Sequence, residues 1–200
     1  MPVFLNNYQK YCDRKLDIID KYFKKEDSIL DAGCGDINHP YVFKRLSQDF
    51  NVTGVDIGHP WNPKIKKGDI SNLNFLNGYF DVVICLDVLE HIKDWKKVLN
   101  ELLRVAKKRV IISVPTTENK LFFKISQFFR KLIGINNIIF AGHFRDYFSE
   151  EIMHIAKEKG FVSNLIKIKF ATPFFADILF KTKLRYGGIF IIDKPSAIQK

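Results

Sequence analysis

The chain has 200 residues, of which 46% are hydrophobic and 27% are charged, a composition that excludes disorder and predicts one packed domain over 1–200. The formal net charge is +10, and it is unevenly distributed. Residues 1–100 hold 14 basic and 14 acidic residues, whereas residues 101–200 hold 18 basic and 8 acidic ones and 13 of the 19 phenylalanines. The second half is therefore expected to attract an anionic partner.

Membrane-spanning and secreted classes do not fit the sequence. No apolar run reaches the ~18 residues needed to cross a bilayer. The N-terminus, Met1–Tyr8, lacks the basic start and apolar stretch of a secretory signal. The three cysteines are far apart and form no CxxC pair, so neither a disulfide framework nor a metal site is indicated. We expect a cytoplasmic protein; the oligomeric state stays open.

Strands and helices alternate along the first half. A helix is predicted over Leu5–Phe23, because apolar residues recur there every three or four positions. The expected elements that follow are a strand at Ser28–Asp31, a helix at Pro40–Asp49, a strand at Val52–Asp56, a buried strand at Phe80–Leu86, a helix at Asp94–Ala106 and a strand at Arg109–Val114. This order predicts an α/β fold with a parallel sheet.

The pattern changes after Pro115. A basic, apolar helix is predicted over Lys120–Gly134. Another helix opens at Ser149, a typical N-cap residue, and closes near Gly160. Late strands are predicted near Ser163–Phe170 and Ile189–Asp193.

A glycine turn between the first strand and the next helix carries the strongest functional signal. Asp31-Ala32-Gly33-Cys34-Gly35 lets a ligand approach the backbone at the carboxyl edge of the sheet. Asp56, 25 residues after Asp31, ends the second strand, where a carboxylate can bind ribose hydroxyls. Asn38 replaces the third glycine of a dinucleotide motif, and the Asp31 and Asp36 charges disfavour a pyrophosphate. These charges suit a ligand with an ammonium or a sulfonium, such as S-adenosylmethionine.

With these motifs the sequence resembles the class I S-adenosylmethionine-dependent methyltransferases, especially the type 11 branch. The resemblance covers about residues 25 to 165. It rests on four stretches in the right order at the right spacing, which are Ile29–Gly35, Gly54–Asp56, Lys67–Ile70 and Phe80–Ile92. The later stretch Gly142–Ser149 also resembles this branch. The resemblance implies a doubly wound, Rossmann-like, mostly parallel seven-stranded sheet with helices on both faces. It also implies a helical lid over 116–148 and an antiparallel last strand at Gly187–Asp193.

The resemblance also implies the cofactor-binding residues. Gly33 and Gly35, with the Asp31 carboxylate, would hold the methionine end, and Asp56 would bind the ribose hydroxyls. Asp69 would face the adenine amino group. The remaining cofactor-binding residues would be Ala32, Cys34, Ile57, Ile70 (packing on the adenine ring), Leu86 and Asp87 (near the methionine end).

Several of these residues also have ordinary structural interpretations. Asp31 could cap the next helix, although the downstream motifs favour cofactor contact. Asp69 could be an ordinary turn residue. Cys34 and Cys85 are predicted to be small buried hydrophobic residues rather than nucleophiles.

The acceptor side of the predicted site rests on three residues. His143 is the candidate general base, since the natural pKa of histidine suits proton removal near neutral pH; the alternative is a histidine that fixes its loop. Arg145 could hold an acidic substrate group or pair with a neighbouring acid. His91 is a candidate substrate residue at the rim of the pocket.

The helix predicted over Lys120–Gly134 has a wide apolar sector and intervening basic residues. It could be a substrate lid, a helix on an anionic membrane surface, or a helix packed in the core. We expect methyl transfer from S-adenosylmethionine to a small-molecule or lipid-like acceptor. The alternatives are an RNA methyltransferase, for which no appended binding module is visible, and a cofactor-binding module without turnover.

Overall fold

The computed structural model describes residues 3–37, 39–116, 149–169 and 186–195. The chain divides into two compact units. The first comprises residues 1–86, 96–111 and 196–200, and the second comprises residues 87–95 and 112–195.

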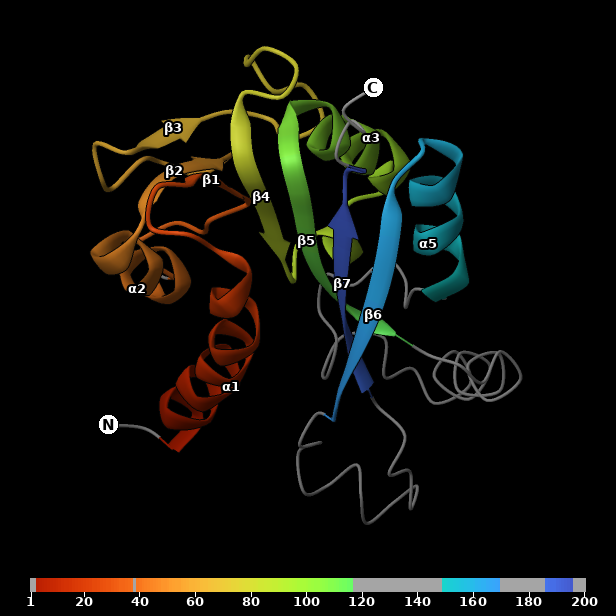
Figure 1. The fold of residues 1–200 in the computed structure, drawn as a ribbon. Coiled ribbons are helices and arrows are strands. Elements are labelled where there is room, and N and C mark those ends of the chain that lie inside the picture. The colour runs from red at the N-terminus through yellow and green to blue at the C-terminus, as the bar shows by residue number, and fades with distance from the viewer. Residues whose placement is uncertain (1–2, 38, 117–148, 170–185, 196–200) are drawn as a thin grey trace. The chain divides into compact units, whose positions relative to one another are not determined.

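The α/β fold class predicted from the sequence is confirmed, with seven strands in one sheet (Figure 1). The hydrogen-bonded strand order is β3-β2-β1-β4-β5-β7-β6. The strands are β1 (Ser28–Ala32), β2 (Asn51–Asp56), β3 (Ile65–Lys67), β4 (Phe80–Leu86), β5 (Ala106–Thr116), β6 (Val162–Lys169) and β7 (Tyr186–Asp193).

In the first unit, strands β1 to β4 run parallel to one another. Strand β1 lies between β2 and β4, with Asp31 opposite Gly54 on one side and Ile84 on the other. Four of the five β1 residues are buried, as the continuous apolar pattern predicts for a central parallel strand. Strand β3 was not predicted, because only Ile65 of its three residues is buried and two lysines follow it at the edge of the sheet.

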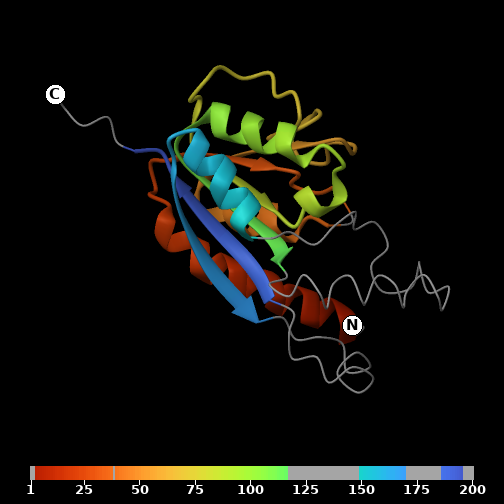
Figure 2. The same ribbon diagram turned by 90° about the vertical axis from the view of Figure 1, so that its right-hand side faces the viewer.

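Three α-helices pack on the strands of the first unit. They are α1 (Val3–Ile19), followed by the 3₁₀ turn η1 (Asp20–Tyr22), then α2 (Tyr41–Asp49) and α3 (Trp95–Val105). Buried residues recur at helical spacing, for example Cys12, Leu16 and Ile19 in α1. Figure 2 shows α3 on one face of these strands and α1 on the other. Helices on both faces, as expected, are therefore present in this unit.

An antiparallel strand pair and a helix form the described part of the second unit. Strands β6 and β7 pair antiparallel from Val162 opposite Asp193 to Lys169 opposite Tyr186, so the expected antiparallel last strand is confirmed. Helix α5 (Ser149–Glu158) is followed by Gly160, where φ is 78°. The Phe161 N–H donates to the Ala156 carbonyl, which closes the helix with a Schellman motif, as the glycine predicts.

A partly buried charge cluster ties together the amino-terminal ends of strands in the first unit. The Asp81 carboxylate accepts hydrogen bonds from the Ser28 N–H at 3.0 Å and from the Ser28 hydroxyl at 2.9 Å. Lys108 Nζ lies 3.0 Å from Asp81 and 2.8 Å from Asp27. Burial alone would raise the pKa of Asp81, but the Ser28 and Lys108 contacts outweigh it and lower that pKa to about 2.

Two segments predicted from the sequence lie outside the described residues. They are the helix at Lys120–Gly134 and all but the first residue of the lid at 116–148. Among the helices that the structure describes, none is both long and apolar enough to cross a membrane.

Candidate functional site

The predicted glycine turn follows β1 directly, and its backbone needs glycine. Gly33 and Gly35 both have φ of 80°, in the left-handed region that glycine adopts without strain. A Cβ on Gly35 would lie 2.7 Å from the His39 carbonyl oxygen. The Gly33 N–H donates to the Val55 carbonyl at 2.8 Å, which ties the turn to the end of β2.

Asp56 joins three loops at the carboxyl end of β2. Its Oδ2 accepts a hydrogen bond from the Gly35 N–H at 2.9 Å, and its Oδ1 accepts one from the Gly58 N–H at 2.8 Å. Its backbone carbonyl accepts the Gly68 N–H at 2.9 Å. Each carboxylate oxygen can accept a further bond, so Asp56 keeps acceptor capacity for a ligand hydroxyl. The Gly58 N–H bond to Asp56 Oδ1 forms an Asx turn. The sequence Asp56-Ile57-Gly58 could have indicated this turn, but we did not predict it.

Asp31 lies in β1, just before the turn, and is only 2% exposed. Its Oδ2 is buried and has no hydrogen-bond partner among the residues that the structure describes. Burial, and secondarily the charge of Asp56, raises the pKa of Asp31 to about 7. A buried carboxylate oxygen without a partner is costly, and an ammonium or sulfonium would relieve that cost. The residues present therefore fit a cationic ligand, and the helix-cap interpretation finds no support in the described contacts of Asp31.

Ala32 and Cys34, which flank Gly33 in the sequence, are both buried. Cys34 is 4% exposed, and burial raises the pKa of its thiol, so it is a poor nucleophile, as predicted. The Trp61 indole N–H donates to the Gly35 carbonyl at 3.2 Å and its ring packs edge-on against Phe43. No sequence signal identified Trp61 as a support of this turn.

Asp69 and Ile70 lie in the loop after β3. Asp69 is exposed, and its Oδ1 accepts the Ser71 N–H at 2.8 Å in an Asx turn. That hydrogen bond lowers the pKa of Asp69. Ile70 is 5% exposed. The turn interpretation of Asp69 is therefore confirmed, while its contact with adenine remains a prediction.

Leu86 ends β4, and Asp87 opens the second unit with φ of 56°, the only positive φ at a described residue other than glycine. Ser113 holds this conformation. Its carbonyl accepts the Asp87 N–H at 2.9 Å, and its hydroxyl donates to Asp87 Oδ1 at 2.8 Å. Ser113 is 2% exposed, and its position in a buried strand offered no sequence signal for this role.

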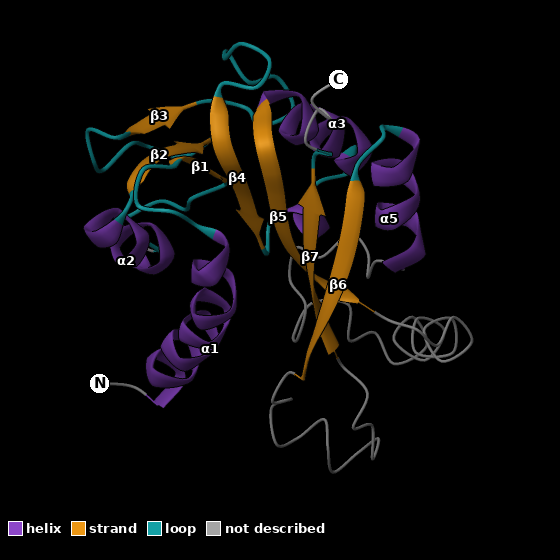
Figure 3. Ribbon diagram, in the orientation of Figure 1, coloured by secondary structure: helices purple, strands orange, loops and turns teal. Residues whose placement is uncertain are grey.

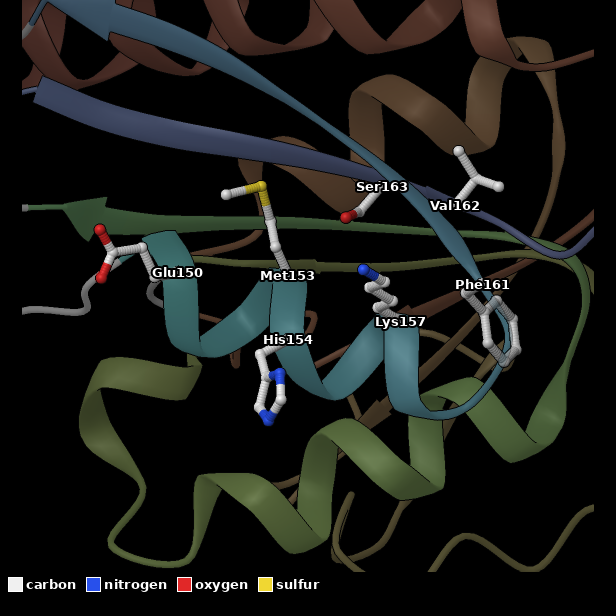
Figure 4. Close-up of a pocket in the computed structure, with 7 residues that line it drawn as sticks. All are labelled: Glu150, Met153, His154, Lys157, Phe161, Val162 and Ser163. Atoms are coloured by element: carbon white, nitrogen blue, oxygen red, sulfur yellow. The ribbon is translucent and has the colours of Figure 1, made fainter.

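The predicted acceptor residues are only partly covered by the structure. His91 is exposed and ends the 3₁₀ turn η2 (Leu89–His91). His143 and Arg145 lie outside the described residues. An open hollow of about 420 Å³ lies between α5 and β6 (Figure 4), and none of the predicted site residues lines it. The described residues contain no group of three or more His, Cys, Asp or Glu side chains that could hold a metal ion.

Comparison with known proteins agrees with the motifs. Residues 30–114 match the family model Methyltransf_11, a methyltransferase domain. An uncharacterized protein of Methanocaldococcus jannaschii is 29% identical over 130 residues, covering 60% of this chain and 56% of that protein. Norajmaline N-methyltransferase of Rauvolfia serpentina is 27% identical over 108 residues, covering 46% and 37%. The chain therefore spans about half the length of the curated relatives that it matches, or less.

The fold has solved counterparts. Phosphoethanolamine N-methyltransferase 2 of Haemonchus contortus superimposes with a TM-score of 0.63 at 17% identity, covering 92% of this chain and 53% of that one. That structure was solved with phosphomonomethylethanolamine and S-adenosylhomocysteine. The family match, the seven-stranded sheet and the glycine turn agree with one another. Over residues 30–114 the chain therefore resembles the methyltransferase domains that the Methyltransf_11 model describes.

Proposed function

We propose that this protein transfers a methyl group from S-adenosylmethionine to a small-molecule acceptor. The observation that carries the proposal is the buried Asp31 carboxylate, whose Oδ2 has no partner among the described residues and which directly precedes a turn that needs glycine. S-adenosylmethionine carries two cationic groups and no phosphate, which suits a site with this charge.

The other cofactor-binding roles follow from the chemistry at the carboxyl end of the sheet. Asp56 would accept the ribose hydroxyls on its remaining lone pairs, held in place by Gly35 and Gly58. Ile57, which is 74% exposed beside Asp56, would cover one face of the adenine ring. Asp69 would accept from the adenine amino group, with Ile70 beneath it. Leu86 and Asp87 would line the methionine end.

The bound cofactor supplies a methyl group on a good leaving group, so the chain's own task is to bind and align the reactants. His143 would remove a proton where the acceptor must lose one, and Arg145 and His91 would bind the acceptor. The basic second half of the sequence suits an acceptor with an anionic group and an apolar portion. A small-molecule acceptor is in keeping with the two N-methyltransferases that the chain resembles.

Calorimetry with S-adenosylmethionine at pH 8 tests the cofactor site. We expect Asp31→Ala to weaken binding by roughly 100-fold or more, because the variant removes one partner of a buried ion pair. Asp56→Ala should weaken binding as well. Asp49→Ala is the matched control, since Asp49 pairs with Arg45 on an exposed helix face. Equal binding by the three variants and the wild type would refute the site assignment.

The acceptor can be sought directly. Cell extract is incubated with the full chain and methyl-labelled S-adenosylmethionine and then separated into polar, lipid and macromolecular fractions. We expect label in the polar or lipid fraction, and we expect His143→Ala to reduce it while cofactor affinity stays near the wild-type value. Label confined to nucleic acid or protein would contradict a small-molecule acceptor.

A further inference from the structure

The loop between β3 and β4, residues 68–79, contains no regular secondary structure (Figure 3). It carries Asp69 and Ile70, the proposed contacts to adenine. A loop of this length needs fixed points if it is to present a carboxylate at one place, because an unrestrained segment loses conformational entropy each time it binds. The first fixed point is the Gly68 N–H, which donates to the Asp56 carbonyl at 2.9 Å.

The second fixed point is one guanidinium group on α3. Arg104 Nη1 donates to the Phe75 carbonyl at 2.8 Å and to Asn77 Oδ1 at 2.8 Å. Its Nη2 donates to the Leu73 carbonyl at 2.9 Å. One side chain therefore contacts the loop at three positions over five residues.

Glu101, one helical turn earlier on α3, completes the arrangement. Its Oε2 accepts Arg104 Nε–H at 2.8 Å and its Oε1 accepts Nη2–H at 2.7 Å, so the pair is bidentate. The same Oε1 also accepts the Leu73 N–H at 2.7 Å. With these bonds all five guanidinium N–H groups of Arg104 have a partner. The backbone of Arg104 adds a further tie, since its carbonyl accepts the Gly78 N–H at 2.9 Å.

We infer that Arg104, oriented by Glu101, is a positioning residue for the adenine side of the cofactor site, acting through the 68–79 loop. The inference rests on the proposed function. Leu73 is 5% exposed and is bonded through both its N–H and its carbonyl, and it lies three residues after Ile70. The Arg104–Glu101 pair thus fixes the loop close to the two residues that would contact adenine. Recognition of the adenine amino group, rather than cofactor affinity as a whole, should depend on Arg104.

A pair of ligands isolates that recognition. S-adenosylhomocysteine carries the 6-amino group of adenine, whereas S-inosylhomocysteine carries a carbonyl oxygen there and would meet the Asp69 carboxylate as a second acceptor. We expect the wild type to prefer S-adenosylhomocysteine by roughly 10- to 100-fold in Kd, the usual worth of a hydrogen bond to a charged group. Asp69→Asn should reduce this ratio.

Calorimetry on the full chain then compares Arg104→Ala and Arg104→Lys with Arg45→Ala. Lysine keeps the positive charge but lacks the planar fork that reaches several acceptors at once. Arg45 is the matched control, because it pairs with Asp49 on an exposed face of α2. We expect both Arg104 variants to lower the Kd ratio to within about threefold of unity and Arg45→Ala to retain it. Arg104→Ala combined with Asp69→Asn should lower the ratio no further than either change alone.

Different outcomes test the role of Arg104 and the proposed function separately. A general loosening of the fold raises both dissociation constants equally and leaves their ratio unchanged; that result in a folded Arg104→Lys protein overturns the inference alone. Wild-type protein that binds neither ligand refutes the proposed function and removes the premise of the inference. Wild-type protein that binds both ligands equally refutes the Asp69 assignment and the inference together.

Discussion

Replacing Asp31 with asparagine should stabilise the protein without ligand while weakening its binding of S-adenosylmethionine. Asparagine keeps the shape of the side chain and removes its charge. Asp31 is 2% exposed, and burial together with the Asp56 charge raises its pKa from 3.8 to about 7. Keeping this carboxylate ionised above pH 7 therefore costs folding free energy in the absence of a cation.

The size and sign of the effect follow from proton linkage. Between pH 3.8 and about 7 the folded protein holds a proton on Asp31 that the unfolded chain has lost, so stability falls as pH rises through this window. A shift of about three pH units corresponds to about 4 kcal/mol. An unpaired asparagine N–H costs about 1–3 kcal/mol in return. The expected net gain at pH 8 is therefore about 1–3 kcal/mol, or roughly 2–12 °C in Tm for a chain of this size.

Thermal unfolding of the wild type and Asp31→Asn at pH 5, 6, 7 and 8 measures this effect. The advantage of the variant should be largest at pH 8 and should disappear near pH 5, where wild-type Asp31 is protonated. Addition of S-adenosylmethionine at pH 8 should raise the Tm of the wild type more than that of the variant. A difference between the two proteins that is the same at all four pH values would refute the reasoning.

Three further predictions concern stability. Asp81→Asn should lower the free energy of unfolding by about 2 kcal/mol at pH 7, because the pKa of Asp81 is lowered from 3.8 to about 2 in the folded protein. This loss of stability should shrink as pH falls from 4 towards 2. A loss that grows over that range would contradict the lowered pKa of Asp81. Gly54→Ala should cost about 1–3 kcal/mol in urea unfolding, since its Cβ would lie 2.6 Å from Cys34 Sγ, and Cys34→Ala in the same chain should recover part of that loss. Ser113→Ala should cost about 1 kcal/mol by the same measurement, whereas no change would show that the Asp87 conformation does not need the hydroxyl.

The order of strands and helices in the first half could be predicted from the sequence, because hydrophobic periodicity reports burial directly. The strand at Phe80–Leu86 has the predicted bounds. The glycine turn after β1 and the acidic residue that ends β2 could also be predicted. A turn with positive φ favours glycine, and Gly33 and Gly35 both have positive φ. Cys34 and Cys85 were correctly predicted to be buried.

Contacts between residues distant in sequence could not be predicted. Nothing local indicates that Arg104 reaches Leu73 and Phe75, or that Ser113 holds Asp87 at a positive φ. Strand β3 escaped prediction because a short edge strand buries too little to leave a pattern.

Composition and motif order by themselves determined the fold class and the cofactor chemistry, since each depends on residue types at fixed short spacings. The charge state of Asp31 was decided only by the tertiary structure. Burial and the proximity of Asp56 are properties of the folded chain, and together they turn an ordinary aspartate into one whose charge depends on pH near 7.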